Sequence, residues 1–301
     1  MMEKADTIGG RWQRKAFRRA VPFLLSAELL CASPARATDL KPETIKAFDH
    51  YMELTEAEIN SETASGKAFL WVDRLPPERR SAAHEDLRQG KAVIERLETL
   101  DNGKRVEIPG GMVHRWIGTV FIPGATLADT LALVEDYDHH QNYYRPDVVR
   151  SKILYRKDND FVIELRFHKK KIVTTVLDTE HDVHYSILDS KHAMSRSRTT
   201  RIQEVDDAGK PDEQLEPAGH DRGFLWRMNT YWRFEEKDGG TYVESRSISL
   251  TRDIPTGLGW MIGPYVNSVP RESLTFTLEA TRTGVLQRVA AHAAALPAHS
   301  E

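Results

Sequence analysis

Hydrophobic and polar residues alternate along most of the chain after residue 111, which is the pattern of β-strands with one buried face. The first such segment spans residues 112–122 and ends at Pro123-Gly124, a turn pair. Later segments of this kind lie at residues 148–154, 161–167, 172–187, 193–205, 224–235 and 242–251. Asp238-Gly239-Gly240 joins the last two and favours a hairpin. The pattern predicts a curved antiparallel sheet.

Helical spacing of hydrophobic residues interrupts this pattern after the first strand and again at the end of the chain. Thr126 stands at a typical N-cap position, and Leu131 and Val134 follow it at helical intervals. A longer helix is predicted from about residue 269 to 293, because Pro270 suits a first helical turn. Its inner face is expected to carry Leu274, Leu278, Thr281, Val285 and Val289. One long C-terminal helix should therefore follow the sheet.

The segment before the sheet, residues 38–110, is predicted to be a mainly helical extension. One helix should run from residue 42 to about 60. Pro76-Pro77 opens a second helix, which is expected to continue past Ile94 and to end at Asp101-Asn102-Gly103. The extension either caps the mouth of a cavity or packs on the outside of the sheet.

An aromatic elbow lies between the short helix and the strand at 148–154. The chain there follows the frame "L..V.DYD.....Y.P.VV.S.IL", which resembles the START/polyketide cyclase-like superfamily (SRPBCC), to which the birch pollen allergen and coenzyme Q-binding proteins also belong. The matching residues are Leu131, Val134, Asp136, Tyr137, Tyr144, Pro146, Val149, Ser151 and Leu154. The resemblance covers residues 112–289. It implies an α+β helix-grip fold, in which a curved antiparallel sheet wraps around the C-terminal helix and ligand occupies the space between them.

Charge is distributed unevenly along the 301 residues. The net charge is −3, but residues 1–37 hold seven basic and three acidic side chains. The remaining chain has 35 basic against 42 acidic residues. An acidic body argues against binding nucleic acid, because neutralising phosphates needs clustered Lys and Arg.

The first 37 residues have the features of an export signal. Basic residues from Arg11 to Arg19 precede an apolar run, and Ala35-Arg36-Ala37 suits cleavage after Ala37. The predicted organisation is therefore an export signal at 1–37, the extension at 38–110, the helix-grip domain at 111–293 and a disordered tail at 294–301. The mature protein is expected in the periplasm or outside the cell. It is expected to have no transmembrane helix, and transient contact with a membrane is an open alternative.

Several residues are candidates for binding a ligand. Alternation assigns one strand face to Phe224, Trp226, Met228, Thr230, Trp232 and Phe234. This face would form either an ordinary core or the wall of an apolar cavity. Arg198 is a candidate for orienting a polar head group, with a solvent-facing charged stripe as the alternative. From the resemblance, the mouth would include Tyr143, Tyr144, Trp260 and Tyr265, and the helix would contribute Leu274 and Leu278.

Metal binding and nucleophilic catalysis find no support in the sequence. Alternation points His181 and His184 to opposite faces of a strand, and no HExxH motif occurs. Cys31 is the only cysteine and would leave with the export signal. Glu164, with Arg166 or His168, is the one set that could serve as an acid–base pair. No metal and no cofactor are expected.

The sequence thus favours non-covalent binding or transport of a hydrophobic or amphipathic small molecule, such as a lipid, fatty acid, quinone or polycyclic compound. Catalysis is the less favoured hypothesis. Two alternatives stay open. One is an enzyme of the polyketide cyclase or dehydratase kind, and the other is an interaction module of the cell envelope with a filled core and an exposed apolar patch.

Overall fold

The computed structural model describes residues 38–64, 68–171, 174–254 and 259–295. The predicted export signal lies outside these ranges, as do residues 296–301 of the predicted tail. These described residues belong to one compact unit.

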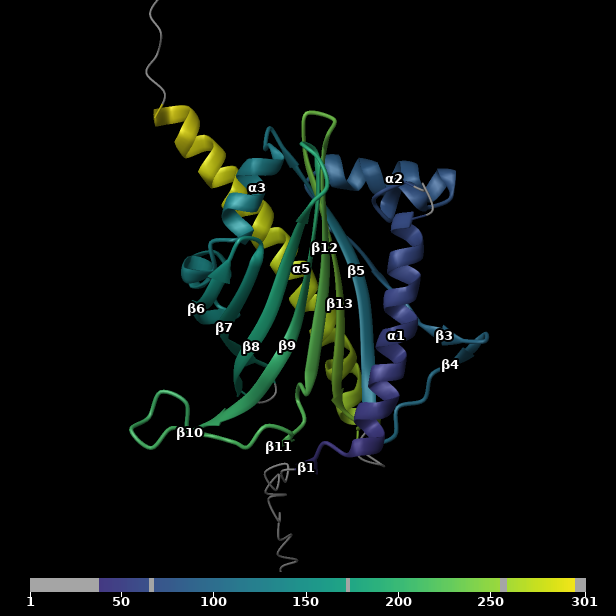
Figure 1. Cartoon of the computed structure of the whole chain (residues 1–301), viewed down its shortest axis with the longest axis vertical. Helices are drawn as coiled ribbons and strands as arrows, with labels where there is room; N and C mark the ends of the chain where they lie inside the picture. The colour runs from purple at the N-terminus through teal and green to yellow at the C-terminus, as the bar shows by residue number, and fades with distance from the viewer. Residues whose placement is uncertain (1–37, 65–67, 172–173, 255–258, 296–301) are drawn as a thin grey trace, which may run out of the picture. The chain divides into compact units, whose positions relative to one another are not determined.

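A curved antiparallel sheet of nine strands dominates this unit (Figure 1). Its order is β2-β5-β13-β12-β9-β8-β7-β6, and β10 pairs with β9 outside that path. The strands are β2 (Val93–Arg96), β5 (Gly111–Pro123), β6 (Val148–Lys157), β7 (Asp160–Lys170), β8 (Thr174–Ile187), β9 (His192–Asp206), β10 (Gln214–Leu215), β12 (Arg227–Lys237) and β13 (Gly240–Arg252). Two small ribbons, β1 (Thr38–Asp39) with β11 (His220–Asp221) and β3 (Leu100–Asp101) with β4 (Lys104–Arg105), complete the strands described.

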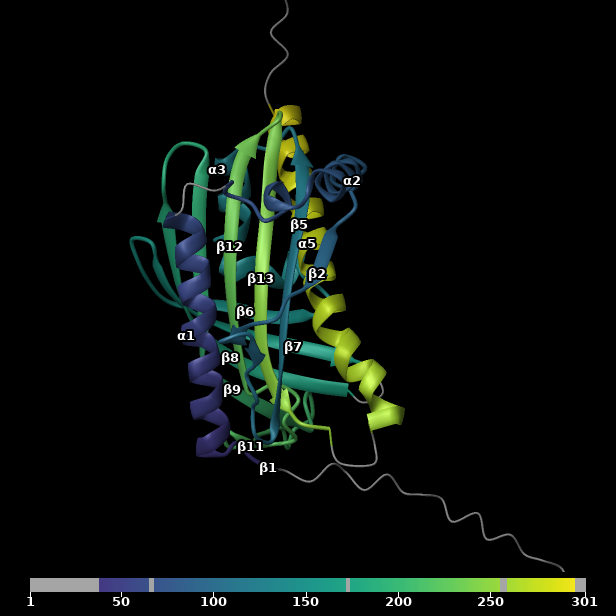
Figure 2. The same cartoon turned by 90° about the vertical axis from the view of Figure 1, so that its right-hand side faces the viewer.

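Two long helices lie on opposite faces of the sheet (Figures 1 and 2). Helix α5 (Gly259–Ala295) crosses the face that we call the inner face, and α1 (Pro42–Ala64) lies on the outer face. The shorter helices are α2 (Pro77–Arg88), α3 (Leu127–Val134) and α4 (His140–Tyr143), with single turns η1 (Val72–Arg74) and η2 (Tyr137–His139). This is a helix-grip fold, as expected from the sequence.

The short helix α3 begins where its sequence predicts. The Thr126 hydroxyl accepts a hydrogen bond from the Asp129 backbone N–H at 3.1 Å, and the Asp129 carboxylate accepts one from the Thr126 N–H at 3.0 Å. These reciprocal bonds satisfy two donors that an uncapped helix would leave unpaired. The helix is thereby fixed beside α5, where Leu133 of α3 packs against Gly284.

Two predicted helix boundaries are wrong. Helix α2 ends at Arg88 because Gly90 adopts a left-handed conformation, with φ +81°, and the following residues form the edge strand β2. Asn102 and Gly103, with φ 48° and 79°, form the turn between β3 and β4 rather than the end of a helix. Helix α5 begins at Gly259, ten residues before the predicted start, so it runs through both Pro264 and Pro270.

Candidate functional site

Three rows of side chains cross the middle of the inner face. The strand register defines each row, since residues directly opposite one another on paired strands point to the same face. The first row is Tyr185, Ser195, Trp232 and Ser245, the second is Val183, Ser197, Thr230, Ser247 and Trp116, and the third is His181, Thr199, Met228, Ser249 and His114. We call the serines and threonines in these rows the hydroxyl rows.

Five hydroxyls in these rows have no hydrogen-bonding partner among the described residues. Among the described residues, Ser195, Thr230, Ser245, Ser247 and Ser249 donate no side-chain hydrogen bond and accept none. None of their oxygens is among the fully occluded atoms that lack a partner. Because buried polar groups are normally paired, these oxygens are positioned to bond water or a ligand.

The rows also keep surface that solvent reaches, although α5 crosses this face. Trp116, Ser197, Thr199, Met228, Thr230 and Ser247 are all half-buried rather than buried. At the other end of the same face, Val120, Phe234 and Val243 have no exposed surface. The first half of α5 diverges from β5 and β13, while its second half lies close behind them (Figure 2). The inner face is thus fully buried at one end and partly exposed at the rows.

Gly118 sets the point at which α5 meets the sheet. A Cβ atom at this position would lie 2.6 Å from a methyl group of Leu278 and 2.4 Å from one of Ile94. Any larger residue would require both methyl groups to shift, so the glycine lets the helix pack closely on β5. The half-buried side chains lie on the N-terminal side of this contact along α5.

His181 is a buried titratable group of the third row. The Thr179 hydroxyl donates to the Leu165 carbonyl at 3.1 Å, so it must accept the 2.8 Å bond from His181 Nε2. The other ring nitrogen, Nδ1, then accepts from the Ser197 hydroxyl at 3.3 Å. Burial lowers the pKa of His181 to about 4, so this ring is neutral at pH 7.

Five predicted ligand-binding residues lie between the sheet and α5. Met228, Trp232 and Phe234 point from β12 to the inner face, and Leu274 and Leu278 are buried on α5. The rings of Trp232 and Phe234 stack with their centroids 6.0 Å apart. The alternation of β12 therefore selected the correct face for its central residues.

The two tyrosines of the elbow have different environments. Tyr144 is buried, and its hydroxyl bonds the Thr281 hydroxyl of α5 at 3.0 Å. Tyr143 is half-buried, and its hydroxyl donates to Asp136 at 3.2 Å. Both tie the elbow to its surroundings. Trp260 and Tyr265 lie within α5, but their side chains fall outside the described residues.

Two predicted binding residues lie on the outer face instead. Trp226 precedes β12 and packs with Phe48, Tyr51 and Met52 of α1, because the chain bends after Gly223 and the alternation starts only at Arg227. Arg198 forms an ion pair with Glu56 of α1. It therefore does not orient a ligand beneath α5.

The predicted acid–base set also points outward. Glu164 forms an ion pair with Arg150 at 3.2 Å. Arg166 pairs with Asp178 at 2.6 Å, and His168 shares its parity on β7. The described residues contain no group of His, Cys, Asp and Glu side chains suited to hold a metal ion.

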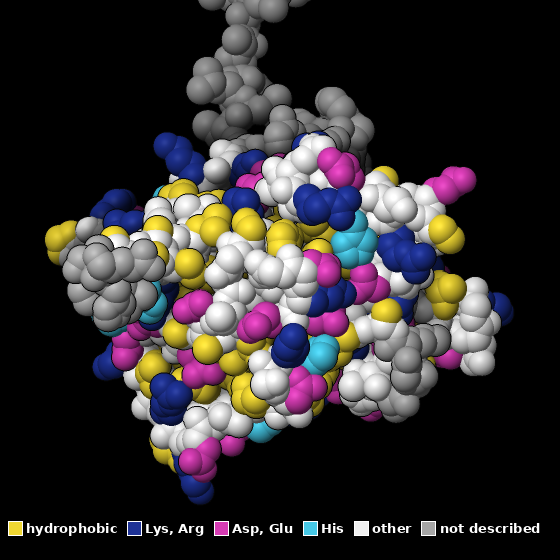
Figure 3. All heavy atoms as spheres, turned by 90° about the horizontal axis from the view of Figure 1, so that it is seen from above, with side chains coloured by type: hydrophobic (Ala, Val, Ile, Leu, Met, Phe, Trp, Pro, Cys, Tyr) yellow, Lys and Arg dark blue, Asp and Glu magenta, His cyan; other side chains and the backbone are white. Residues whose placement is uncertain are grey.

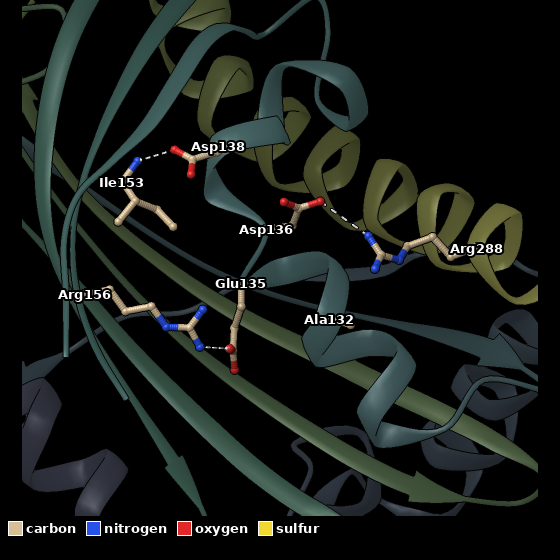
Figure 4. A pocket seen from close by; sticks show the side chains of 7 residues that line it. All are labelled: Ala132, Glu135, Asp136, Asp138, Ile153, Arg156 and Arg288. Carbon is tan, nitrogen blue, oxygen red and sulfur yellow. Dashed lines mark hydrogen bonds and ion pairs between the residues drawn. The ribbon is translucent and has the colours of Figure 1, made fainter. Parts of the chain in front are cut away.

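An open pocket of about 410 Å³ lies apart from the rows, between α3, η2, β6 and α5 (Figure 4). Arg156 pairs with Glu135 at 3.2 Å and Arg288 pairs with Asp136 at 3.4 Å across this pocket. Asp138 accepts a hydrogen bond from the Ile153 N–H at 2.8 Å. Its charged walls do not suit an apolar ligand.

The upper end of the molecule carries a mixed surface. Viewed from above, hydrophobic, basic and acidic side chains are interspersed there (Figure 3). Within the part of the chain that the structure describes, no helix is both long and apolar enough to cross a membrane.

Several solved structures are similar to this chain. A STAR-related lipid transfer protein from Xanthomonas axonopodis shares 17% of its residues over 64% of this chain and 98% of its own, with a TM-score of 0.40. The aromatase/cyclase Zhui from Streptomyces sp. R1128 shares 13% over 59% and 96%, with a TM-score of 0.40. The lipid transfer and protein localization domain of human StarD13 shares 8% over 69% and 96%, with a TM-score of 0.37. No protein-family model matches the chain, and no curated protein does.

Acid should destabilise the protein through three buried histidines. Burial lowers the pKa of His114, His140 and His181 from 6.5 to about 4 each. Between about pH 4 and pH 6.5 the unfolded chain binds more protons than the folded chain. The free energy of unfolding is therefore highest above pH 6.5 and decreases as the pH falls to about 4. The loss per histidine approaches about 1.4 kcal/mol per pH unit.

Urea unfolding at a series of pH values measures this slope. His181→Asn should reduce it, while His184→Asn, at an exposed position on the other face of β8, should leave it unchanged. Equal slopes for the wild-type protein and His181→Asn would contradict a neutral, buried His181.

Proposed function

We propose that the protein binds and carries a hydrophobic or amphipathic small molecule on the inner face of its sheet, beneath the first half of α5. The observation that carries this proposal is the set of half-buried side chains in the three rows, above all Trp116, Met228 and Trp232. A well-packed core would bury large side chains of this kind. Apolar groups with a few polar neighbours are the usual lining of a small-molecule site.

The export features of the N-terminus support a role in the cell envelope or outside the cell. There the bound molecule would be a lipid or another poorly soluble compound that needs shielding from water. Burial of the ligand's apolar surface would supply the binding free energy, at about 25 cal/mol per Å². Transfer of the ligand to and from a membrane would involve transient contact with that membrane.

An enzyme acting on a hydrophobic substrate is the second candidate, and His181 is the observation that favours it. Its Nδ1 faces the Ser197 hydroxyl at 3.3 Å, and Thr179 holds its other nitrogen. This arrangement could take a proton from a bound molecule. It ranks second because a pKa of about 4 makes His181 a weak base at neutral pH.

Filling the rows should abolish binding without unfolding the protein. Thr230→Trp places an indole at the centre of the second row, where it would occupy the volume assigned to the ligand. We expect the wild-type chain, purified from its own envelope fraction, to show a stoichiometric apolar adduct in native mass spectrometry, and Thr230→Trp to lack it. Circular dichroism and the urea midpoint report whether the variant is folded.

Ser186→Trp is the matched control, because Ser186 lies on the outer face of β8 opposite Met194. It should retain the adduct. Retention of the adduct by a folded Thr230→Trp protein would show that the ligand lies elsewhere. Loss of turnover on His181→Gln with the adduct preserved would instead favour the enzyme.

A further inference from the structure

The second of the three rows continues beyond β5 onto the edge strand β2. In the register of these two strands, Arg96 lies opposite Trp116. Ile94, two residues earlier on β2, lies beside Gly118 on the face that α5 covers. Because residues two apart on a strand share a face, Arg96 also belongs to the inner face. It is exposed there, at the end of the second row.

Arg96 is the one side chain of the three rows that is charged at pH 7. The two histidines of the rows, His114 and His181, are buried and neutral. Burial is the main cause that lowers the pKa of His114 to about 4, and the positive charge of Arg96 lowers it further. The guanidinium therefore lies close enough to the inner face of β5 to act on a group of the third row.

The side chain of Arg96 makes no hydrogen bond or ion pair with any other described residue. Glu95, on the opposite face of β2, pairs with Arg79, and Glu98 pairs with Arg105. The sequence of residues 255–270, which includes the start of α5, contains no Asp or Glu, so this segment cannot supply a carboxylate to Arg96. The guanidinium can thus bind an anion without breaking an existing ion pair.

The second row becomes less polar from β2 towards β8. In order across the sheet it consists of Arg96, Trp116, Ser247, Thr230, Ser197 and Val183. The hydroxyls of Ser247 and Thr230 are unpartnered, whereas Val183 at the far end belongs to the hydrophobic core. The row crosses six strands, which is about 24 Å at the usual strand spacing. An elongated molecule along it would meet a charged end and an apolar end.

Arginine is suited to bind a carboxylate or a phosphate. Its planar guanidinium donates two parallel hydrogen bonds to two oxygens of such a group. Because Arg96 is exposed, an anion bound to it keeps part of its hydration, and the large cost of burying an ion does not arise. The hydroxyl of Ser247 is the next free donor along the row.

We propose that Arg96 binds the anionic head group, a carboxylate or a phosphate, of an amphipathic ligand whose apolar part lies along the second row towards β8. This inference rests on the proposed binding function and narrows it to anionic amphiphiles. Arg96 thus takes the role for which the sequence suggests Arg198, which is paired with Glu56 on the outer face.

Probes that share a dodecyl or lauroyl chain test the inference on the full chain at pH 8. Laurate and dodecyl phosphate are anionic, dodecanol is uncharged, and dodecyltrimethylammonium is cationic. Each competes with Nile red, an uncharged dye whose fluorescence reports binding to an apolar site. We expect at least one of the two anions to bind about fivefold or more tightly than the cation, since a partly exposed ion pair contributes an effect of about this size.

The variant Arg96→Gln removes the charge and keeps a polar side chain. It should weaken the binding of at least one anion by about fivefold or more and leave dodecanol and Nile red unchanged. The anion that loses affinity identifies the head group as a carboxylate or a phosphate. Arg201→Gln is the control, because it makes the same change of charge at an exposed position opposite Glu180 on the outer face. It should alter the binding of no probe.

Two results would overturn the inference while the binding function stands. In the first, Nile red binds but Arg96→Gln leaves the affinities of both anions unchanged. In the second, the cation binds as tightly as both anions. Failure of Nile red and every probe to bind would overturn the binding function as well. Because Arg96 is exposed, we expect the variant to keep the circular dichroism spectrum of the wild-type protein.

Discussion

Replacement of Arg246 by methionine should lower the free energy of unfolding by about 3–5 kcal/mol. Only 2% of this side chain is exposed, and its guanidinium lies 2.6 Å from Glu62 and 3.4 Å from Glu244. Glu244 is completely buried and also accepts a hydrogen bond from the Trp71 N–H. Loss of the arginine leaves both carboxylates without their closest cation, and the Glu244 carboxylate is completely buried.

Urea unfolding monitored by tryptophan fluorescence measures the change. Arg201→Met serves as the control, because Arg201 is exposed and its 3.3 Å pair with Glu180 is screened by solvent. We expect a change below about 1 kcal/mol for the control. A similar small change for Arg246→Met would mean that the network beneath α1 contributes little to stability.

Shortening Leu278 to alanine should cost about 2–5 kcal/mol. This side chain is completely buried and packs against Gly118 of β5. It belongs to the same hydrophobic core as Leu133 of α3, where α5 packs on the sheet. Removal of its methyl groups leaves a cavity at the point where the helix and β5 approach most closely. The loss is therefore expected to affect the attachment of the whole second half of α5.

Leu286→Ala offers a matched control on the same helix, since Leu286 is only half-buried. It should cost clearly less than Leu278→Ala in the same denaturation experiment. Hydrogen exchange of α5 backbone amides would then be faster in Leu278→Ala than in Leu286→Ala. Equal losses in both variants would show that Gly118 and Leu278 do not form the principal attachment.

Alternation identified most of the sheet because one face of each central strand is more apolar than the other. Residues 242–251 and 112–122 became β13 and β5 with only small changes at their ends. The register, however, depends on pairing between strands and on bulges such as that between Glu180 and His181. Such non-local pairing cannot be obtained from the periodicity of one segment.

The helix boundaries show a different limit. Pro270 favoured a helix start near residue 269, yet α5 begins at Gly259 and includes both Pro264 and Pro270. Conversely, the apolar pair Val93 and Ile94 suited the predicted helix, but pairing with β5 makes them a strand. Local preference is weak in both cases, and tertiary packing decides.

The candidate site was predicted only in part. The aromatic residues of β12 drew attention because they are large, and Trp232 and Phe234 do face α5. The pattern does not predict a role for the serines of β9 and β13, because isolated small polar residues on a strand resemble a solvent-facing edge. Their importance arises only when the register places Ser195, Trp232 and Ser245 in one row.

The unpartnered hydroxyls have a consequence for how this protein can change over evolution. Groups that make no bond within the fold can be exchanged for others of similar size at little cost in stability, so the rows are free to vary. The stabilising ion pairs lie on the other side of the sheet, around Arg246 and Glu62. Single substitutions in the rows can therefore change the chemistry of the proposed site without a loss from the small free energy of unfolding that keeps a protein folded.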